Sequence, residues 1–174
     1  MSSAATQILY SRHVAQSIAA MLLELAIRPF ELDLISNMES IDIKAQLLEH
    51  FPAFRNMANT TVDCVIASSP VKRIPAGTVI FTPGTPCSMF PLVLSGCLRV
   101  SMAGAKGREL PLYRVRPGES CILTTTCLLG ETAYAATGVA ESDTTAIAVS
   151  GDGFNRLIEH EPLFRAFEIG RAHV

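Results

Sequence analysis

The chain has 174 residues, a length typical of one domain. Nearly half of the residues (49%) are apolar and 17% are charged, which excludes an intrinsically disordered protein, because such chains have few apolar residues and a high net charge. The formal net charge is −2, so the totals show no basic surplus of the kind that nucleic-acid-binding domains carry. The composition therefore indicates a globular domain with a substantial apolar core.

The apolar stretch near the N-terminus is too interrupted to cross a membrane, which takes about 20 mainly apolar residues. Between residues 14 and 27 it contains three polar or charged residues, Gln16, Ser17 and Glu24. Charged residues also follow too closely for a secretory signal. The five cysteines are an odd number without the spacing of a small disulfide scaffold, which favours free thiols in a reducing compartment. We expect a cytoplasmic protein with no membrane partner.

Three helices are predicted in the first part of the chain. Residues 4–27 are rich in alanine, leucine and isoleucine and predict one amphipathic helix. It ends near Arg28, because Pro29 disfavours helical backbone in the residue before it. Apolar residues spaced three or four apart predict a second helix over Met38–Phe51, and a short third helix fits Asn59–Ala67.

Residues 71–150 consist of short β-type runs separated by glycine and proline. Turns at such short intervals are typical of an antiparallel sandwich or barrel. Alternation along one run predicts two sets of side chains on opposite faces. The first set is Leu92, Leu94, Leu98, Val100 and Met102, and the second is Val93, Ser95, Cys97, Arg99 and Ser101. Helical spacing returns at Gly153–Glu159, so the expected order is helices, a β-roll and a closing helix.

The order of the motifs along the chain is more specific than any one of them. They are Ile74–Gly84, Leu92–Val100, Gly107–Leu110, Pro117–Ser120, a short helix-like Thr124–Leu129, Phe154–Ile158 and Glu161-Pro162. Together, over about residues 60–166, they resemble the sensor domain of the Crp/Fnr family of bacterial transcription regulators. The resemblance implies a mainly β fold with flanking helices (α+β). Its centre would be an antiparallel double-stranded β-helix, a jelly-roll-like β-roll of the cyclic-nucleotide-binding-domain type.

The same resemblance divides the chain into segments. Residues 60–166 are expected to form the β-roll with the start of a C-terminal helix, and residues 1–59 a helical lead-in. Residues 1–37 have two origins that stay open: an upstream start codon outside the native protein, or a genuine helix that covers the roll. Residues 168–174 resemble the translation of a common sequencing adapter, so we expect a tail that is not native.

In this family the roll continues into a dimerisation helix and then into a winged helix-turn-helix that binds DNA. The chain stops where the dimerisation helix begins, at Pro162–Phe167, so we expect the DNA-binding half to be missing. Binding of DNA and formation of a homodimer are accordingly expected of the intact protein. The expected function is effector sensing within such a regulator. The alternative is a stand-alone regulatory roll that acts through protein contacts, and the downstream reading frame distinguishes the two.

Family members that bind cAMP hold its phosphate in a cassette, where a Gly-Glu pair precedes a short helix and an arginine follows it. Here the Gly-Glu positions read Ile122-Leu123, and no lysine or arginine occurs between Pro117 and Asn155. A phosphate there would lack a charge-assisted hydrogen bond worth roughly 1.5–3 kcal/mol. We therefore expect that neither cAMP nor cGMP binds, that no cofactor is held, and that the partner is an unidentified small effector. The residues expected at its pocket are Gly118, Glu119, Ser120, Ile122, Leu123, Thr124, Thr125, Thr126, Tyr134 and Ala135.

Two cysteines, Cys121 and Cys127, flank the cassette helix. They are either a redox pair or soft-metal site, or two buried small apolar side chains, and their acidic surroundings favour the second interpretation. No metal site is expected. Histidine is absent from residues 51–159, which argues against a metal-dependent cupin enzyme and against a histidine-ligated haem in the roll. The chain shows no catalytic constellation, so we do not expect an enzyme.

Overall fold

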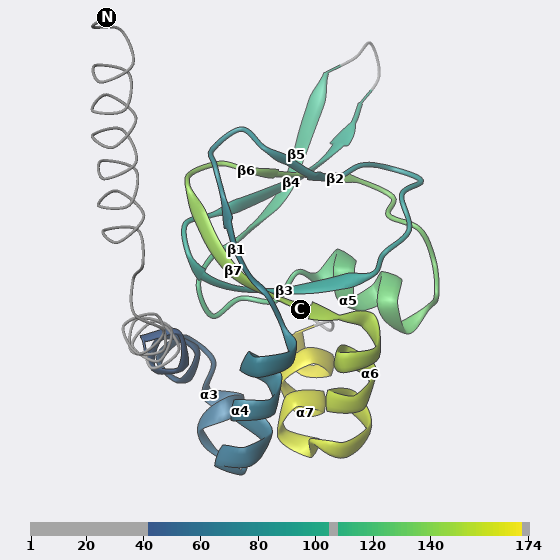
Figure 1. Ribbon diagram of the computed structural model, residues 1–174. Coiled ribbons are helices and arrows are strands. Elements are labelled where there is room, and N and C mark those ends of the chain that lie inside the picture. Colours follow the sequence, from purple (N-terminus) through teal and green to yellow (C-terminus); the bar gives the residue numbers. More distant parts are fainter. Residues whose placement is uncertain (1–41, 105–107, 172–174) are drawn as a thin grey trace, which may run out of the picture. The chain divides into compact units, whose positions relative to one another are not determined.

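Short strands joined by tight turns dominate the computed structural model, which describes residues 42–104 and 108–171. The elements in order are a helix over residues 42–50, α3 (Pro52–Arg55), α4 (Asn59–Ser68), β1 (Val71–Ile74), β2 (Val79–Phe81), β3 (Met89–Ser95), β4 (Leu98–Ala103), β5 (Glu109–Val115), α5 (Ile122–Leu129), β6 (Thr137–Ala140), β7 (Thr144–Ser150), α6 (Gly151–His160) and α7 (Pro162–Arg171). The strands build a β-roll, and α3, α4, α6 and α7 gather on one side of it (Figure 1).

Two antiparallel sheets form the roll, with strand orders β1-β7-β3 and β2-β6-β4-β5. The consecutive strands β3 and β4 belong to different sheets, and the chain turns between them at Gly96. This glycine has a φ of +84°, in the left-handed region that side chains other than glycine rarely adopt. A Cβ at this position would lie 2.3 Å from the carbonyl oxygen of Asp143, so the turn requires glycine for space as well.

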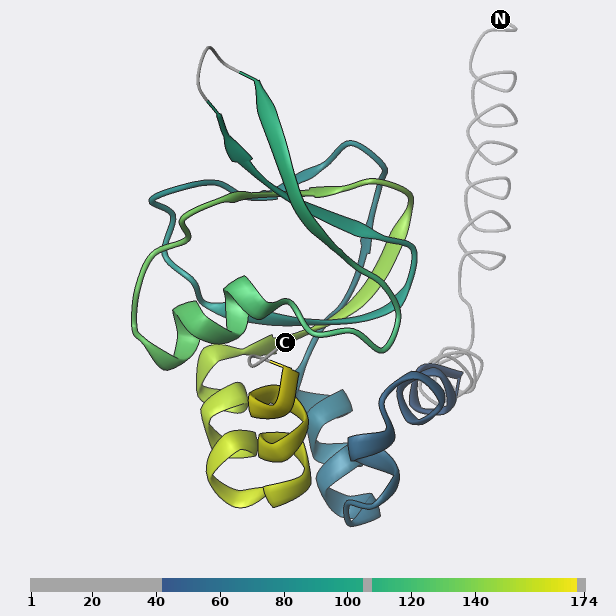
Figure 2. The ribbon, with the colours of Figure 1, turned by 180° about the vertical axis from the view of Figure 1, so that it is seen from behind.

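The sheet β1-β7-β3 is apolar on both faces, which gives the molecule two cores. Its outer face packs against the helices through side chains such as Leu92, Leu94 and Ile147. In both views β3 lies between the helices and the rest of the roll (Figures 1 and 2). Five completely buried phenylalanines contribute to this outer core: Phe51, Phe54, Phe90, Phe154 and Phe164. Because most of these rings meet edge to face, the helices are held to the sheet by aromatic packing.

The inner core fills the roll between the two sheets. Its members are Phe81, Val93, Leu98, Val100, Val115, Cys121, Cys127, Tyr134, Ala136 and Ala140. Because Leu92 packs in the outer core and Leu98 in the inner core, the single alternating pattern predicted across β3 and β4 is wrong. The turn at Gly96 interrupts that pattern, and both faces of β3 are buried.

The same prediction is also wrong at the far end of β4. Ser101 is completely buried, whereas Met102 is 44% exposed. The pairing of β4 with β5 shifts register between Val100 and Ser101. Beyond that point the two strands project out of the roll (Figures 1 and 2), so an apolar side chain on this part of β4 has no sheet to pack against.

The predicted fold class is confirmed by these antiparallel sheets and flanking helices. The helices expected over Asn59–Ala67 and Gly153–Glu159 correspond to α4 and α6. Of the helix predicted over Met38–Phe51, residues 42–50 are described and are helical. The helix over residues 4–27 and the interpretation of residues 1–37 lie outside the described residues. Within the described part of the chain, no helix has the length and apolar character needed to cross a membrane.

Candidate functional site

A tight turn at Pro117-Gly118 positions the segment that corresponds to the cassette. Gly118 has a φ of +78°, and a Cβ there would lie 2.4 Å from the carbonyl oxygen of His50. The turn therefore packs against the end of the helix over residues 42–50. The chain then forms α5, which contacts β3 and α6 and lies between the roll and α6 in Figure 2.

The N-terminus of α5 is capped by a tyrosine of the neighbouring strand β5. The backbone N–H of Leu123 donates a hydrogen bond to the Tyr113 hydroxyl over 2.9 Å, and this hydroxyl lies 3.7 Å from the Cys121 sulfur. Burial raises the pKa of Tyr113 above its usual range, so the phenol stays protonated. The first N–H groups of a helix are the ones that bind anions. One of these groups is therefore already satisfied by the protein itself.

Three side chains meet on the roll side of α5: Cys87, Thr124 and Tyr134. The Cys87 thiol donates to the Tyr134 hydroxyl over 3.1 Å, and Thr124 Oγ1 lies 3.5 Å from the same hydroxyl. The Tyr134 ring stacks on Phe81 with 4.0 Å between the ring centroids and 6° between the planes. Burial raises the pKa of both Cys87 and Tyr134, so both stay neutral at physiological pH. Neutral side chains thus fill the roll interior beside α5.

Another side of α5 contacts the C-terminal helix α7. The hydroxyls of Ser120 and Thr125 donate to the two carboxylate oxygens of Glu168 over 2.7 and 2.9 Å. Glu168 is 1% exposed, and a buried carboxylate needs such hydrogen bonds because it has lost its water. Ser120 and Thr125 are therefore engaged within the chain. The interpretation of residues 168–174 as a non-native tail stays a prediction.

The ten residues predicted for the pocket lie on several sides of α5. Thr124 and Tyr134 come together inside the roll, whereas Ile122, Thr126 and Ala135 are exposed. The others are Gly118 and Glu119 in the turn before α5, Ser120 and Thr125 against Glu168, and Leu123 at Tyr113. The structure thus brings together some of these residues and separates others.

Three residues of this site were not predicted from the sequence: Phe81, Cys87 and Tyr113. For Tyr113 a signal was available, because it alternates with the buried Val115 along β5 and so belongs on the inner face. Phe81 and Cys87 reach the site through contacts with Tyr134, which lies more than 40 residues further along the chain. No local pattern indicates such contacts.

Cys121 and Cys127 are both buried and both free. Cys121 precedes α5 and Cys127 lies six residues later within the helix, which corresponds to about 9 Å along the axis. A disulfide needs Cα atoms within about 7 Å of each other, so this pair requires α5 to unwind before it can bridge. Among the described residues, no group of three or more histidine, cysteine or acidic side chains is arranged to hold a metal ion. A redox role stays a prediction.

The arginines of the second sheet form ion pairs outside the roll. Arg114 donates two hydrogen bonds to Glu141, of 2.5 and 2.7 Å, and Arg99 lies 2.6 Å from a carboxylate oxygen of Glu109. The Arg114 guanidinium lowers the pKa of Glu141 to about 2. Because Leu98 on the same strand as Arg99 points into the inner core, Arg99 faces the other way. These cations therefore do not replace the phosphate partner that the cassette lacks.

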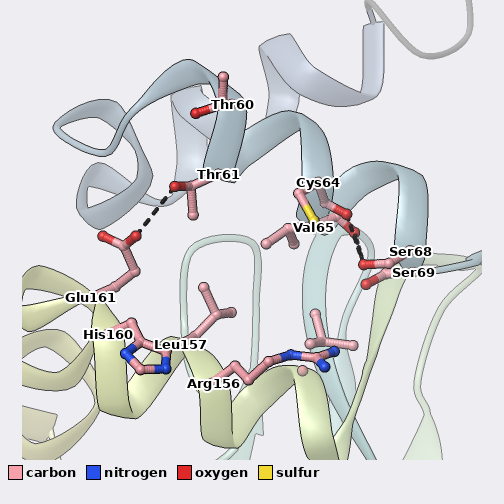
Figure 3. Close-up of a pocket in the computed structure, with 12 residues that line it drawn as sticks. Thr60, Thr61, Cys64, Val65, Ser68, Ser69, Arg156, Leu157, His160 and Glu161 are labelled. Carbon is pink, nitrogen blue, oxygen red and sulfur yellow. Dashed lines mark hydrogen bonds between the residues drawn. The ribbon is translucent and has the colours of Figure 1, made fainter.

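Two cavities of similar size lie on opposite faces of the sheet β1-β7-β3. The inner one, of about 320 Å³, lies inside the roll against Ala146 and Ala148. The outer one, of about 350 Å³, lies between α4 and α6 against Val149. Figure 3 shows the outer cavity, where Arg156 extends from α6 and the Thr61 hydroxyl donates to Glu161 over 3.2 Å. Both cavities fall in the size range of small-molecule sites.

The two antiparallel sheets and the flanking helices define a β-roll of the cyclic-nucleotide-binding type. Residues 71–161, from the start of β1 to the end of α6, match the cyclic nucleotide-binding domain family. The chain therefore belongs to the cyclic nucleotide-binding domain family. Among curated proteins, none matches the sequence.

Several solved structures share this fold. The sensor domain of the transcriptional regulator DNR from Pseudomonas aeruginosa has 21% identity and a TM-score of 0.63, over 76% of this chain and 88% of that chain. The catabolite activator protein of Thermus thermophilus has 28% identity and a TM-score of 0.60, over 70% of this chain and 56% of that chain. A mutant regulatory subunit of a cAMP-independent protein kinase A from Trypanosoma brucei, bound to cAMP, has 16% identity and a TM-score of 0.64. The match covers 78% of this chain and 48% of that chain. The chain spans about half the length of the last two.

Proposed function

We propose that the chain is the effector-sensing domain of a bacterial transcription regulator of the Crp/Fnr type, and that its effector is not a cyclic nucleotide held in the cassette. Membership of the cyclic nucleotide-binding domain family supports a regulatory, ligand-sensing role. The likeness to the catabolite activator protein, at 28% identity, supports the assignment to a transcription regulator. In the intact protein, the effector would shift the population of two arrangements of the helices that follow the roll.

The hydrogen bond from the Leu123 N–H to Tyr113 carries the second part of this proposal. A cyclic phosphate needs free N–H groups at the helix N-terminus and a cation beside it. Tyr113 reduces the number of free N–H groups, because it already accepts a hydrogen bond from the Leu123 N–H. The cation is also missing, because the sequence from Pro117 to Asn155 contains no lysine or arginine. Because the same segment contains several acidic residues, a phosphate would also meet repulsion.

Calorimetric titration of the folded chain with cAMP and cGMP tests this part of the proposal. We expect no binding heat for either nucleotide, with circular dichroism confirming that the sample is folded. A dissociation constant in the micromolar range for either nucleotide would contradict the proposal.

The assignment to a transcription regulator is tested by the genomic sequence across codon 168. We expect native codons that differ from those of residues 168–174 and that continue into a helix-turn-helix. A native reading frame without one would favour the alternative, a stand-alone roll that regulates a partner through protein contacts. The chain by itself is expected to cause no sequence-specific shift of DNA in a gel, because it contains no recognition helix among its described residues.

A further inference from the structure

The cavity inside the roll is lined mainly by apolar side chains. It has a volume of about 320 Å³ and lies against the inner face of the sheet β1-β7-β3. The space exists because the central strand β7 presents only the methyl groups of Ala146 and Ala148 there. Ile80 and Met89, which are more than one third exposed, lie at its edge. An apolar ligand group would therefore find both an interior surface and an apolar entrance.

The wall of the cavity toward α5 is fixed before any ligand arrives. It consists of the stacked rings of Phe81 and Tyr134, both of which line the cavity. A Cβ at Gly138 would lie 2.4 Å from the Phe81 ring, so this ring lies directly on the backbone of β6. The Tyr134 hydroxyl is bonded to Cys87. Because these contacts hold the wall in place, a ligand would not have to order it on binding.

Among the residues that the structure describes, Lys72 is the one charged residue that lines the cavity. It lies on the edge strand β1 directly opposite Ala146, so the antiparallel register places both residues on the same face of the sheet. Lys72 forms no ion pair with the described part of the chain. The hydroxyl groups of the lining belong to Thr85, Ser88 and Tyr134, and among the described residues no acidic side chain lines the cavity. Within the described part of the chain, the cavity thus combines apolar walls with a single cation that has no acidic partner.

We propose that this cavity binds a small amphipathic monoanion, of which a medium-chain carboxylate is the simplest example. Its apolar part would lie between the alanines of β7 and the Phe81–Tyr134 stack, and its carboxylate would pair with Lys72. A neutral ligand would form no ion pair with Lys72. A cyclic nucleotide would place its polar sugar against apolar walls. That this ligand is the effector rests on the proposed function, whereas the binding itself does not.

The test compares octanoate with 1-octanol, its neutral counterpart, by amide NMR titration of the full chain. We expect saturable shifts at Lys72, Ala146 and Ala148, and binding of the acid that is about fivefold tighter than binding of the alcohol, the upper range for an ion pair at an exposed site. The absence of shifts at these residues would overturn the proposal. Equal affinity for acid and alcohol would overturn the role of the cation.

Two variants with matched controls locate the site. Lys72→Gln is expected to remove the preference for the acid without changing the affinity for the alcohol, whereas Arg108→Gln, an exposed cation outside the cavity, leaves both unchanged. Ala148→Leu fills the cavity and is expected to abolish binding of both ligands, whereas Ala103→Leu, on the exposed end of β4, does not. Binding that survives Ala148→Leu would contradict the location. The nucleotide titration and the genomic sequence test the proposed function separately, so the two failures are distinguishable.

Discussion

At the start of α5, the Tyr113 hydroxyl and the Leu123 N–H form a contact that links strand and helix. Tyr113→Phe removes the acceptor and leaves a half-buried N–H without a partner. We expect the free energy of unfolding to fall by about 1–3 kcal/mol, measured by denaturant titration. Tyr134→Phe is the comparison: its hydroxyl contacts the Cys87 thiol, a weak donor, and Thr124 Oγ1 at the long distance of 3.5 Å. Because both contacts are weak, we expect a smaller fall in the free energy of unfolding. Equal stability of Tyr113→Phe and the parent chain would contradict the capping role.

The ion pair of Glu141 with Arg114 should make the stability of the folded chain depend on pH. The pKa of Glu141 falls from 4.5 to about 2 in the folded state, so the pair contributes stability above pH 4.5 and loses it as the pH falls toward 2. Denaturant titrations should show the parent chain to be more stable than Glu141→Gln at about pH 6, with a smaller difference at about pH 3. Glu131→Gln, at an exposed glutamate with no ion pair in the described structure, serves as the control. A difference that does not change with pH would rule out this account.

At the scale of elements, the turns determine which strand joins which sheet. Gly84 and Gly96 have nearly the same positive φ, but an added Cβ meets nothing within 4 Å at Gly84 and meets backbone at 2.3 Å at Gly96. Gly84→Ala should lower the free energy of unfolding by about 1–2 kcal/mol, because alanine is strained in the left-handed backbone conformation. Gly96→Ala should lower the free energy of unfolding by about 4 kcal/mol or more, because the β3–β4 turn must also move to make room for the added methyl group. Thermal unfolding measures both, and equal losses would show that space at Gly96 does not matter.

The helix α5 is held in place by contacts on two sides. On one side, Thr124 Oγ1 lies 3.5 Å from the hydroxyl of Tyr134, in the segment between α5 and β6. On another side, Thr125 donates a hydrogen bond to Glu168 of α7. Thr124 faces the roll, and Thr125 faces Glu168. In this structure α5 therefore contacts both the roll and α7, and the contact with α7 is made through Glu168, a residue of the segment that we predict not to be native.

For the molecule as a whole, the frequent turns predicted an antiparallel β fold and the apolar spacing predicted its flanking helices. The specific β-roll fold was implied by the resemblance to the Crp/Fnr sensor domain. The predicted boundaries of α4 and α6 are correct within a few residues, because their apolar spacing is local. The roles of Tyr113 and Lys72 could not be predicted in this way. Each depends on pairing between distant segments: Lys72 lies opposite Ala146 only because β1 pairs with β7.

Burial on both faces of β3 is the reason why the face of each of its side chains could not be predicted from the sequence. Alternation assigns faces only when one face is polar, and Leu92, Val93 and Leu94 are all buried. The predicted site had the same weakness, since it followed the cassette segment and took no account of the strands that face it.

The measurement that tests the central claim most directly is the amide resonance of Leu123 during a titration with cAMP. This N–H is bonded to Tyr113, so the account predicts that its chemical shift stays constant up to millimolar nucleotide. A saturable shift of the Leu123 resonance, together with those of neighbouring residues in α5, would show that the cassette binds the cyclic phosphate and would contradict the account.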